Sequence, residues 1–156
     1  ERVTGTTSPG FGIDGCSVPN FATTLHGMAR AMAHFAAAPD GSAEARLHQA
    51  MRLHPDLVAG ETRACTNLMR AMNGKVALKT GAEGFFIAIL PDQNIGVALK
   101  AACGTKRAAE CAITSILVKL GALDPNHPEA LKYRNAPIEN RRGIITGTLK
   151  PAAGFA

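Results

Sequence analysis

The sequence predicts an α+β fold in which helices pack on an antiparallel sheet. Apolar residues at helical spacing dominate up to about residue 72, strand-like composition follows from residue 75, and a further helical pattern begins near residue 105. A block of helices followed by a block of strands is typical of α+β folds rather than of alternating α/β folds. The chain has 156 residues, 46% of them hydrophobic and 4% aromatic. It can therefore bury a core made mainly of aliphatic side chains.

The first part of the chain predicts a loop followed by two helices. Residues 4–19 are rich in Gly, Pro, Thr and Ser and indicate a loop with at most a short strand. From Asn20 onward a helix is expected, because an apolar stripe recurs at spacings of three and four residues: Phe21, Leu25, Met28, Met32 and Phe35. The segment 39–41, Pro-Asp-Gly, ends this helix. Ser42 is the expected N-cap of a second helix that runs to about His54.

The middle of the chain predicts a third helix and a three-stranded antiparallel sheet. The helix is expected over 62–72, ending at Asn73 and Gly74. Segments 75–80, 84–92 and 94–102 have strand composition, and Pro-Asp-Gln-Asn at 91–94 is typical of a turn between the last two. In the third segment Ile95, Val97 and Leu99 alternate and should face one side of the sheet.

The last part of the chain predicts one more helix and a tail. Thr105 should cap a helix that continues to about Leu120, where Gly121 ends it. Its buried side is expected to carry Ala109, Ile113, Ile116 and Leu120. Residues 124–156 are rich in Pro and Asn. We expect them to form an extended tail that packs on the body, with a short edge strand at 142–149.

Bulk properties exclude several classes of partner. The formal charge of +5 is small and scattered, and no basic stripe with interleaved aromatics indicates nucleic-acid binding. No apolar run approaches the roughly 20 residues of a membrane span, and residues 1–10 lack the layout of a signal peptide. The four cysteines include no C-x-x-C pair, which favours reduced thiols in a cytoplasmic protein.

The stretch "KVALKTGAEGFFIAIL", residues 75–90, contains the first chemical motif. Lys79, Thr80 and Gly81 form a K-T-G sequence at the end of an expected strand. K-T-G on a strand lines the acyl-transfer site of serine β-lactamases and penicillin-binding proteins, where a cation and a hydroxyl can hold a substrate carboxylate or a developing oxyanion. Glycine lets the backbone approach a ligand closely. The alternative is a lysine at the start of a loop, with its ammonium in water.

The stretch "GIDGCSVP", residues 12–19, contains the second chemical motif. Asp14 and Cys16 are one residue apart, so on an extended segment both side chains would point the same way. A carboxylate and a thiolate can orient a ligand or share a zinc ion. From the residue types alone, the alternative is a turn aspartate before Gly15 and a small buried thiol.

Three longer segments, 12–36, 61–101 and 140–147, together resemble one family. They are similar to the C-terminal half of the rhizobial-type L-asparaginases, the asparaginase II family with a serine-β-lactamase-like fold. The resemblance implies hydrolysis of L-asparagine to L-aspartate and ammonia, with the serine of an N-terminal S-x-x-K motif as nucleophile and a neighbouring zinc site. It also implies that residues 1–156 are a single partial domain, the C-terminal half of a larger one.

The resemblance assigns roles to six residues of this sequence. It implies catalytic roles for Lys79, Asp14 and Cys65, substrate binding by Thr80 and Gly81, and zinc ligation by Cys16. By its position alone, Cys65 would instead be a thiol in the core of a helix.

The sequence also departs from the family pattern. It contains no S-x-x-K motif. The residues three positions after its four serines are Phe11, Asn20, Ala45 and Val118, and none of them is a lysine. The C-S-G-K zinc segment is absent as well. Both belong to the N-terminal half of the family. We therefore expect this chain to be inactive alone, and to associate with that half or to form a homo-oligomer.

Two other functions remain open at this point. The chain could be a fragment of a penicillin-binding or β-lactamase-type serine hydrolase, which shares K-T-G, or a non-catalytic dimerisation or binding module with a degenerate site. The segment "DGCSVP" and the lack of an export signal favour the asparaginase interpretation over a cell-wall role.

Overall fold

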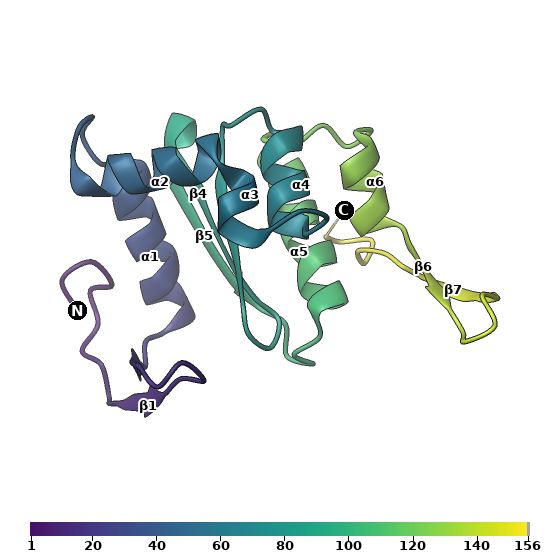
Figure 1. The fold of residues 1–156 in the computed structure, drawn as a ribbon, viewed down its shortest axis with the longest axis horizontal. Helices are drawn as coiled ribbons and strands as arrows, with labels where there is room; N and C mark the ends of the chain where they lie inside the picture. Colours follow the sequence, from purple (N-terminus) through teal and green to yellow (C-terminus); the bar gives the residue numbers. More distant parts are fainter. Residues whose placement is uncertain (156) are drawn as a thin grey trace.

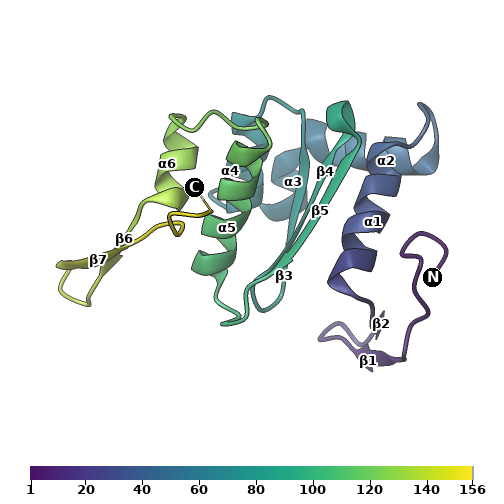
Figure 2. The same cartoon turned by 180° about the vertical axis from the view of Figure 1, so that it is seen from behind.

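The computed structural model describes residues 1–155 and shows three layers (Figures 1 and 2). The middle layer is an antiparallel sheet of β3 (Ala77–Gly81), β4 (Phe85–Leu90) and β5 (Ile95–Lys100), in that order. One face of the sheet packs against α1 and α2, and the other against α4 and α5. The predicted α+β class is confirmed. Strand β4 is central, so β3 and β5 form the two edges.

The layer on the first face consists of α1 (Leu25–Ala36) and α2 (Ala43–Leu53), followed by the short α3 (Pro55–Ala59). Helix α1 lies directly on the backbone of β5. A Cβ atom at Gly96 would collide with backbone atoms of Ala29 and Ala33, so only glycine permits this close approach. Helix α2 begins where the sequence predicts, because the Ser42 hydroxyl accepts a hydrogen bond from the backbone N–H of Ala45 at 3.2 Å.

The predicted start of the first helix, at Asn20, is wrong. The helix begins at Leu25, because the hydroxyl of Thr24 accepts the backbone N–H of Gly27 at 2.9 Å and caps this turn. Phe21 lies instead in a short strand and is 67% exposed. Its agreement with the helical stripe is a coincidence of spacing.

The layer on the second face consists of α4 (Ala64–Ala71), α5 (Lys106–Lys119) and α6 (Pro128–Arg134). The largest core lies between these helices and the sheet, and its fully buried side chains include Leu68, Met69, Leu78, Phe86, Ile113 and Leu117. Helix α4 ends before Asn73 and Gly74, and α5 begins after Thr105, as the sequence predicts. The predicted turn between β4 and β5 is a single 3₁₀ turn, Pro91–Gln93.

Two small hairpins lie outside the layers (Figures 1 and 2). Strands β1 (Phe11–Ile13) and β2 (Pro19–Phe21) pair near the N-terminal end of α1, and all their residues are exposed. Strands β6 (Ala136–Glu139) and β7 (Ile145–Leu149) pair after α6. The sequence predicts a strand at 142–149, but β7 is shorter and pairs with β6, because the Asn140 side chain accepts backbone N–H groups of Arg142 and Ile144 and builds the intervening turn.

The segment after residue 124 contains more regular secondary structure than the sequence predicts. It contains α6, which packs on α4 and α5 and buries Ala130 completely. Pro128 stands at the first turn of α6, and the imidazole Nδ1 of His127 accepts the backbone N–H of Glu129 at 3.1 Å. The hydroxyl of Tyr133 accepts a hydrogen bond from the side-chain amide of Asn67 in α4, at 3.1 Å. These contacts attach the segment to the body.

Within residues 1–155, no helix combines the length and apolarity needed to cross a bilayer. All four cysteines are free, as expected for reduced thiols.

Candidate functional site

Lys79 lies on an edge strand, which explains how an ammonium fits into an apolar stretch. Strand β3 pairs with β4 on one side only, with Lys79 opposite Ile87 and Gly81 opposite Phe85. The neighbours Ala77 and Leu78 are fully buried, whereas Lys79 is exposed. Its Nζ donates a hydrogen bond to the carbonyl of Thr80 at 2.6 Å. The ammonium therefore lies against the surface of the strand, with two further N–H groups available to a ligand.

The outer edge of β3 is covered by two sulfur atoms of α4. The backbone N–H of Leu78 donates to Sδ of Met69 at 3.3 Å, and the backbone N–H of Thr80 donates to Sγ of Cys65 at 3.2 Å. Residues four apart on a helix are separated by about 6 Å along its axis, and residues two apart on a strand by about 6.8 Å. The matching repeats let α4 satisfy both outward-facing amides and hold the K-T-G strand in place.

Cys65 is a buried thiol that supports this strand. Its side chain is 1% exposed. Burial raises the pKa of the thiol, while the hydrogen bond from Thr80 and the charge of Lys79 act in the opposite direction. The net rise means that Cys65 is protonated at neutral pH. A protonated thiol is a poor nucleophile, and the hydrogen bond from the backbone N–H of Thr80 shows that Cys65 helps to position the K-T-G strand.

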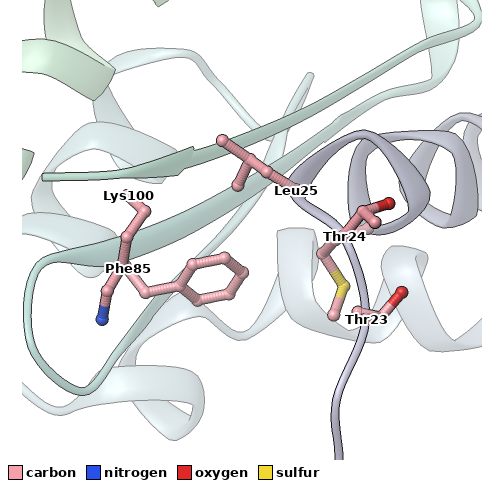
Figure 3. A pocket seen from close by; sticks show the side chains of 6 residues that line it. Thr23, Thr24, Leu25, Phe85 and Lys100 are labelled. Atoms are coloured by element: carbon pink, nitrogen blue, oxygen red, sulfur yellow. The ribbon is translucent and has the colours of Figure 1, made fainter. Parts of the chain in front are cut away.

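A cleft opens on the Lys79 face of the sheet, at the end where α1 begins (Figure 3). Its volume is about 310 Å³, and it is lined by Thr23, Thr24, Leu25, Met28, Phe85 and Lys100. Phe85 pairs with both Gly81 and Lys100, so these residues share a face with Lys79. The Phe85 ring also lies over Gly81. A Cβ atom added at Gly81 would be only 2.7 Å from Cδ1 of Phe85.

The structure adds Phe85 and Lys100 to the candidate residues of this end. Sequence analysis missed them, because only the strand register places Lys100 opposite Phe85. The sequence does contain a signal for Lys100: it is a lysine at the end of an apolar strand, just as Lys79 lies near the end of the first strand of the sheet. Lys100 Nζ donates to the carbonyl of Ala82 at 3.3 Å, across the β3–β4 turn. Two ammonium groups therefore make this end attractive to a carboxylate.

Asp14 and Cys16 lie in the turn of the β1–β2 hairpin, and both are exposed. The hydrogen bonds of Asp14 are local: its backbone N–H donates to Val18 at 3.0 Å, and its carbonyl accepts from Ser17 at 2.8 Å. In both Figures 1 and 2 this hairpin lies at the same end of the molecule as the β3–β4 turn. Within residues 1–155, however, no hydrogen bond or ion pair connects Asp14 or Cys16 with Lys79.

The described residues do not by themselves provide a zinc site. Among residues 1–155, no three His, Cys, Asp or Glu side chains are grouped closely enough to hold a metal ion. A structural zinc ion needs four ligands and a catalytic one at least three. Cys16 and Asp14 could supply two of them, so a complete site would require ligands from another segment or chain.

The sequence model of one family, L-asparaginase II, matches residues 1–151. The chain belongs to this family. No curated protein gave a significant match. Membership supports an asparaginase-type amidohydrolase function with a small-molecule substrate.

Proposed function

We propose that this chain is the K-T-G-bearing part of an L-asparaginase that hydrolyses L-asparagine to L-aspartate and ammonia. The observation that carries the proposal is the family match over residues 1–151. The exposed Lys79 on the edge of the sheet is consistent with it, as is the cleft on the same face, which Lys100 lines and Lys79 does not.

In this proposal the K-T-G strand binds the substrate and stabilises charge. The ammonium of Lys79 holds the α-carboxylate of asparagine through a charge-assisted hydrogen bond. The Thr80 side chain points to the opposite face of β3 from Lys79, so its hydroxyl, which makes long contacts of 3.3 Å with the carbonyls of Gly81 and Phe85, would serve as a second donor only to a substrate that lies across the strand edge. Gly81 contributes to the substrate site through its missing side chain, which leaves room for the Phe85 ring that lines the cleft.

The nucleophile must come from outside these 156 residues, which contain no S-x-x-K. A serine oxygen supplied by another segment or chain would attack the side-chain amide carbon of asparagine. The serine proton passes to the amide nitrogen and ammonia leaves, so that an acyl ester remains. Water then hydrolyses the ester and releases L-aspartate. Lys79 alone cannot both take the proton and attack, so the chain by itself should be inactive.

Asp14 and Cys16 complete the proposal on the hairpin side. When the segment with the S-x-x-K and C-S-G-K motifs is bound, Cys16 would provide one zinc ligand and Asp14 would support it. The exposure of the hairpin is consistent with docking of such a segment. A cytoplasmic location also belongs to this proposal and rests on the four free thiols.

The test is ammonia release from L-asparagine by the chain alone and after co-expression with an N-terminal family segment that carries both motifs. We expect no turnover by the chain alone and turnover by the assembled protein. Lys79→Ala should reduce kcat/KM about 100-fold. Lys75→Ala, at an exposed lysine just before β3, is the matched control and should have little effect.

Three outcomes would contradict the proposal. Turnover by the pure chain would show that it needs no outside nucleophile. Turnover of a chromogenic β-lactam without asparagine hydrolysis would favour the β-lactamase-type alternative. An assembled protein that binds asparagine but never releases ammonia would favour a binding module.

A further inference from the structure

Helix α2 lies at the end of the molecule opposite the β3–β4 turn (Figures 1 and 2). Its residues contribute to a further cavity, which is mainly polar. The cavity measures about 270 Å³ and is lined by Asp40, Gly41, Ala45, His48, Gln49 and Arg52. It shares no residue with the cleft near Lys79. The proposed asparagine hydrolysis uses none of its residues.

Two of the residues that line this cavity each carry a buried polar atom without a hydrogen-bond partner. These atoms are Nδ1 of His48 and Nε of Arg52. His48 is 5% exposed, and Arg52 is half-buried. The two residues are four positions apart on α2, which places their side chains next to each other on one face of the helix. Buried polar groups in native proteins are nearly always paired, so two adjacent unpaired atoms call for an explanation.

The surrounding contacts define which chemistry would satisfy these atoms. Nη1 of Arg52 donates to the carbonyl of Gly74 at 2.9 Å, which anchors the guanidinium beside the cavity. Within residues 1–155, Arg52 forms no ion pair with an acidic side chain. Burial and the charge of Arg52 lower the pKa of His48, against a weaker opposing effect of Asp40. The imidazole is therefore neutral at pH 7 and can donate one N–H.

We propose that this cavity binds a small α-amino acid. The ligand carboxylate accepts hydrogen bonds from Nε of Arg52 and Nδ1–H of His48, and its ammonium faces the carboxylate of Asp40. Guanidinium is well suited to a carboxylate because its N–H groups lie in one plane. A zwitterion matches a wall that carries one cation and one anion. Since both unpaired atoms are buried in the free chain, binding requires both side chains to rotate so that Nδ1 of His48 and Nε of Arg52 reach the cavity.

Calorimetric titration of the full chain with L-serine tests the proposal. We expect binding at one site, weakened at least tenfold by Arg52→Lys, which keeps the charge but removes Nε, and by His48→Phe. Arg46→Lys is the matched control, because Arg46 is exposed on the same helix and does not line the cavity. Lys79→Ala should bind L-serine unchanged, which separates this site from the asparagine site.

Two analogues test the ligand class. 3-Hydroxypropionate lacks the ammonium of L-serine and should bind at least tenfold more weakly to the wild-type chain, with the difference lost in Asp40→Asn. Inorganic phosphate should not compete. Equal binding of all three compounds would overturn the amino-acid assignment.

Amide chemical shifts in the wild-type chain make the test independent of how the variants fold. L-Serine should shift Gly41, Gln49 and Gly74 and leave Thr80 and Lys100 unchanged. No shift at millimolar L-serine, or shifts confined to the K-T-G end, would overturn the proposal.

Discussion

The two segments expected to form one site differ in how the chain supports them. The K-T-G strand pairs with β4, rests on Leu78 in the core and has its outer amides covered by the sulfur atoms of α4. The Asp14–Cys16 turn joins two strands of three residues each, all of them exposed. The first segment is held by the body of this chain, and the second is held by its own turn.

This difference indicates which of the proposed active-site groups the chain holds in place by itself. Catalytic groups act best when packing and hydrogen bonds fix their position before the substrate arrives. Lys79 has such a scaffold within residues 1–155. Asp14 and Cys16 are held by the hydrogen bonds of their own hairpin, so we expect contacts with another segment or chain to fix their position relative to Lys79. The following changes test this contrast, from the largest expected effect to the smallest.

Leu78→Ala should have the largest effect, because it removes the fully buried side chain directly beside Lys79. Leu-to-Ala changes in cores cost about 3 kcal/mol of unfolding free energy. Urea unfolding monitored by circular dichroism would measure the loss. A loss below about 1 kcal/mol would mean that the K-T-G strand is not fixed by the core.

Cys65→Ala should cost less, about 1–2 kcal/mol, because it leaves the backbone N–H of Thr80 without its sulfur acceptor. Amide hydrogen exchange should become faster at Thr80 and remain unchanged at Leu78, whose N–H is held by Met69. Cys111→Ala is the matched control, since this buried cysteine lies on α5 away from β3. Equal exchange at Thr80 in both variants would argue against the positioning role of Cys65.

Thiol alkylation should distinguish the two segments chemically. Cys103 should react first, because the hydrogen bond with Thr105 lowers its pKa and it is exposed. Cys16 should also react in the folded chain because it is exposed, and Cys65 only after unfolding because burial raises its pKa. Iodoacetamide labelling followed by mass spectrometry gives the order. Labelling of Cys65 before Cys16 in the folded chain would contradict the burial of Cys65 and the exposure of Cys16.

The raised pKa of Cys65 also predicts how stability depends on pH. The folded state holds the thiol proton more tightly than the unfolded state does. This contribution to stability is therefore complete below the ordinary thiol pKa and decreases as the pH rises through it and beyond. The alkaline loss of stability should be smaller in Cys65→Ala than in the wild-type chain, as measured by urea unfolding between pH 7 and 10. An identical loss in the variant and the wild-type chain would contradict a raised pKa at Cys65.

Ile13→Ala should have the smallest effect, below about 0.5 kcal/mol, because this side chain in β1 is 66% exposed. The same urea titration measures it, with Leu78→Ala as the comparison. A loss above about 1 kcal/mol would show that the hairpin contributes to the core. A larger effect only in the assembled protein would support docking of another segment at the hairpin.

Local sequence signals correctly predicted the ends of helices that are followed by Asn or Gly. Asn73 and Gly74 end α4, and Gly121 follows α5, because these residues readily adopt the backbone conformations that terminate helices. The start of α1 was misplaced because Phe21 fits the apolar stripe, whereas the cap at Thr24 decides the boundary. Helix α6 was missed, although Pro128 in its first turn was a usable signal.

The sequence by itself determined the α+β class, the three-stranded sheet and the K-T-G motif at the end of its first strand. These follow from local periodicity and turn chemistry, which act over a few residues. Only the tertiary structure decided that Phe85 and Lys100 flank that motif, that α4 sulfur atoms cover its edge, and that the Asp14–Cys16 turn stands apart. Such relations depend on strand register and helix packing between residues far apart in the chain, which no short stretch of sequence encodes.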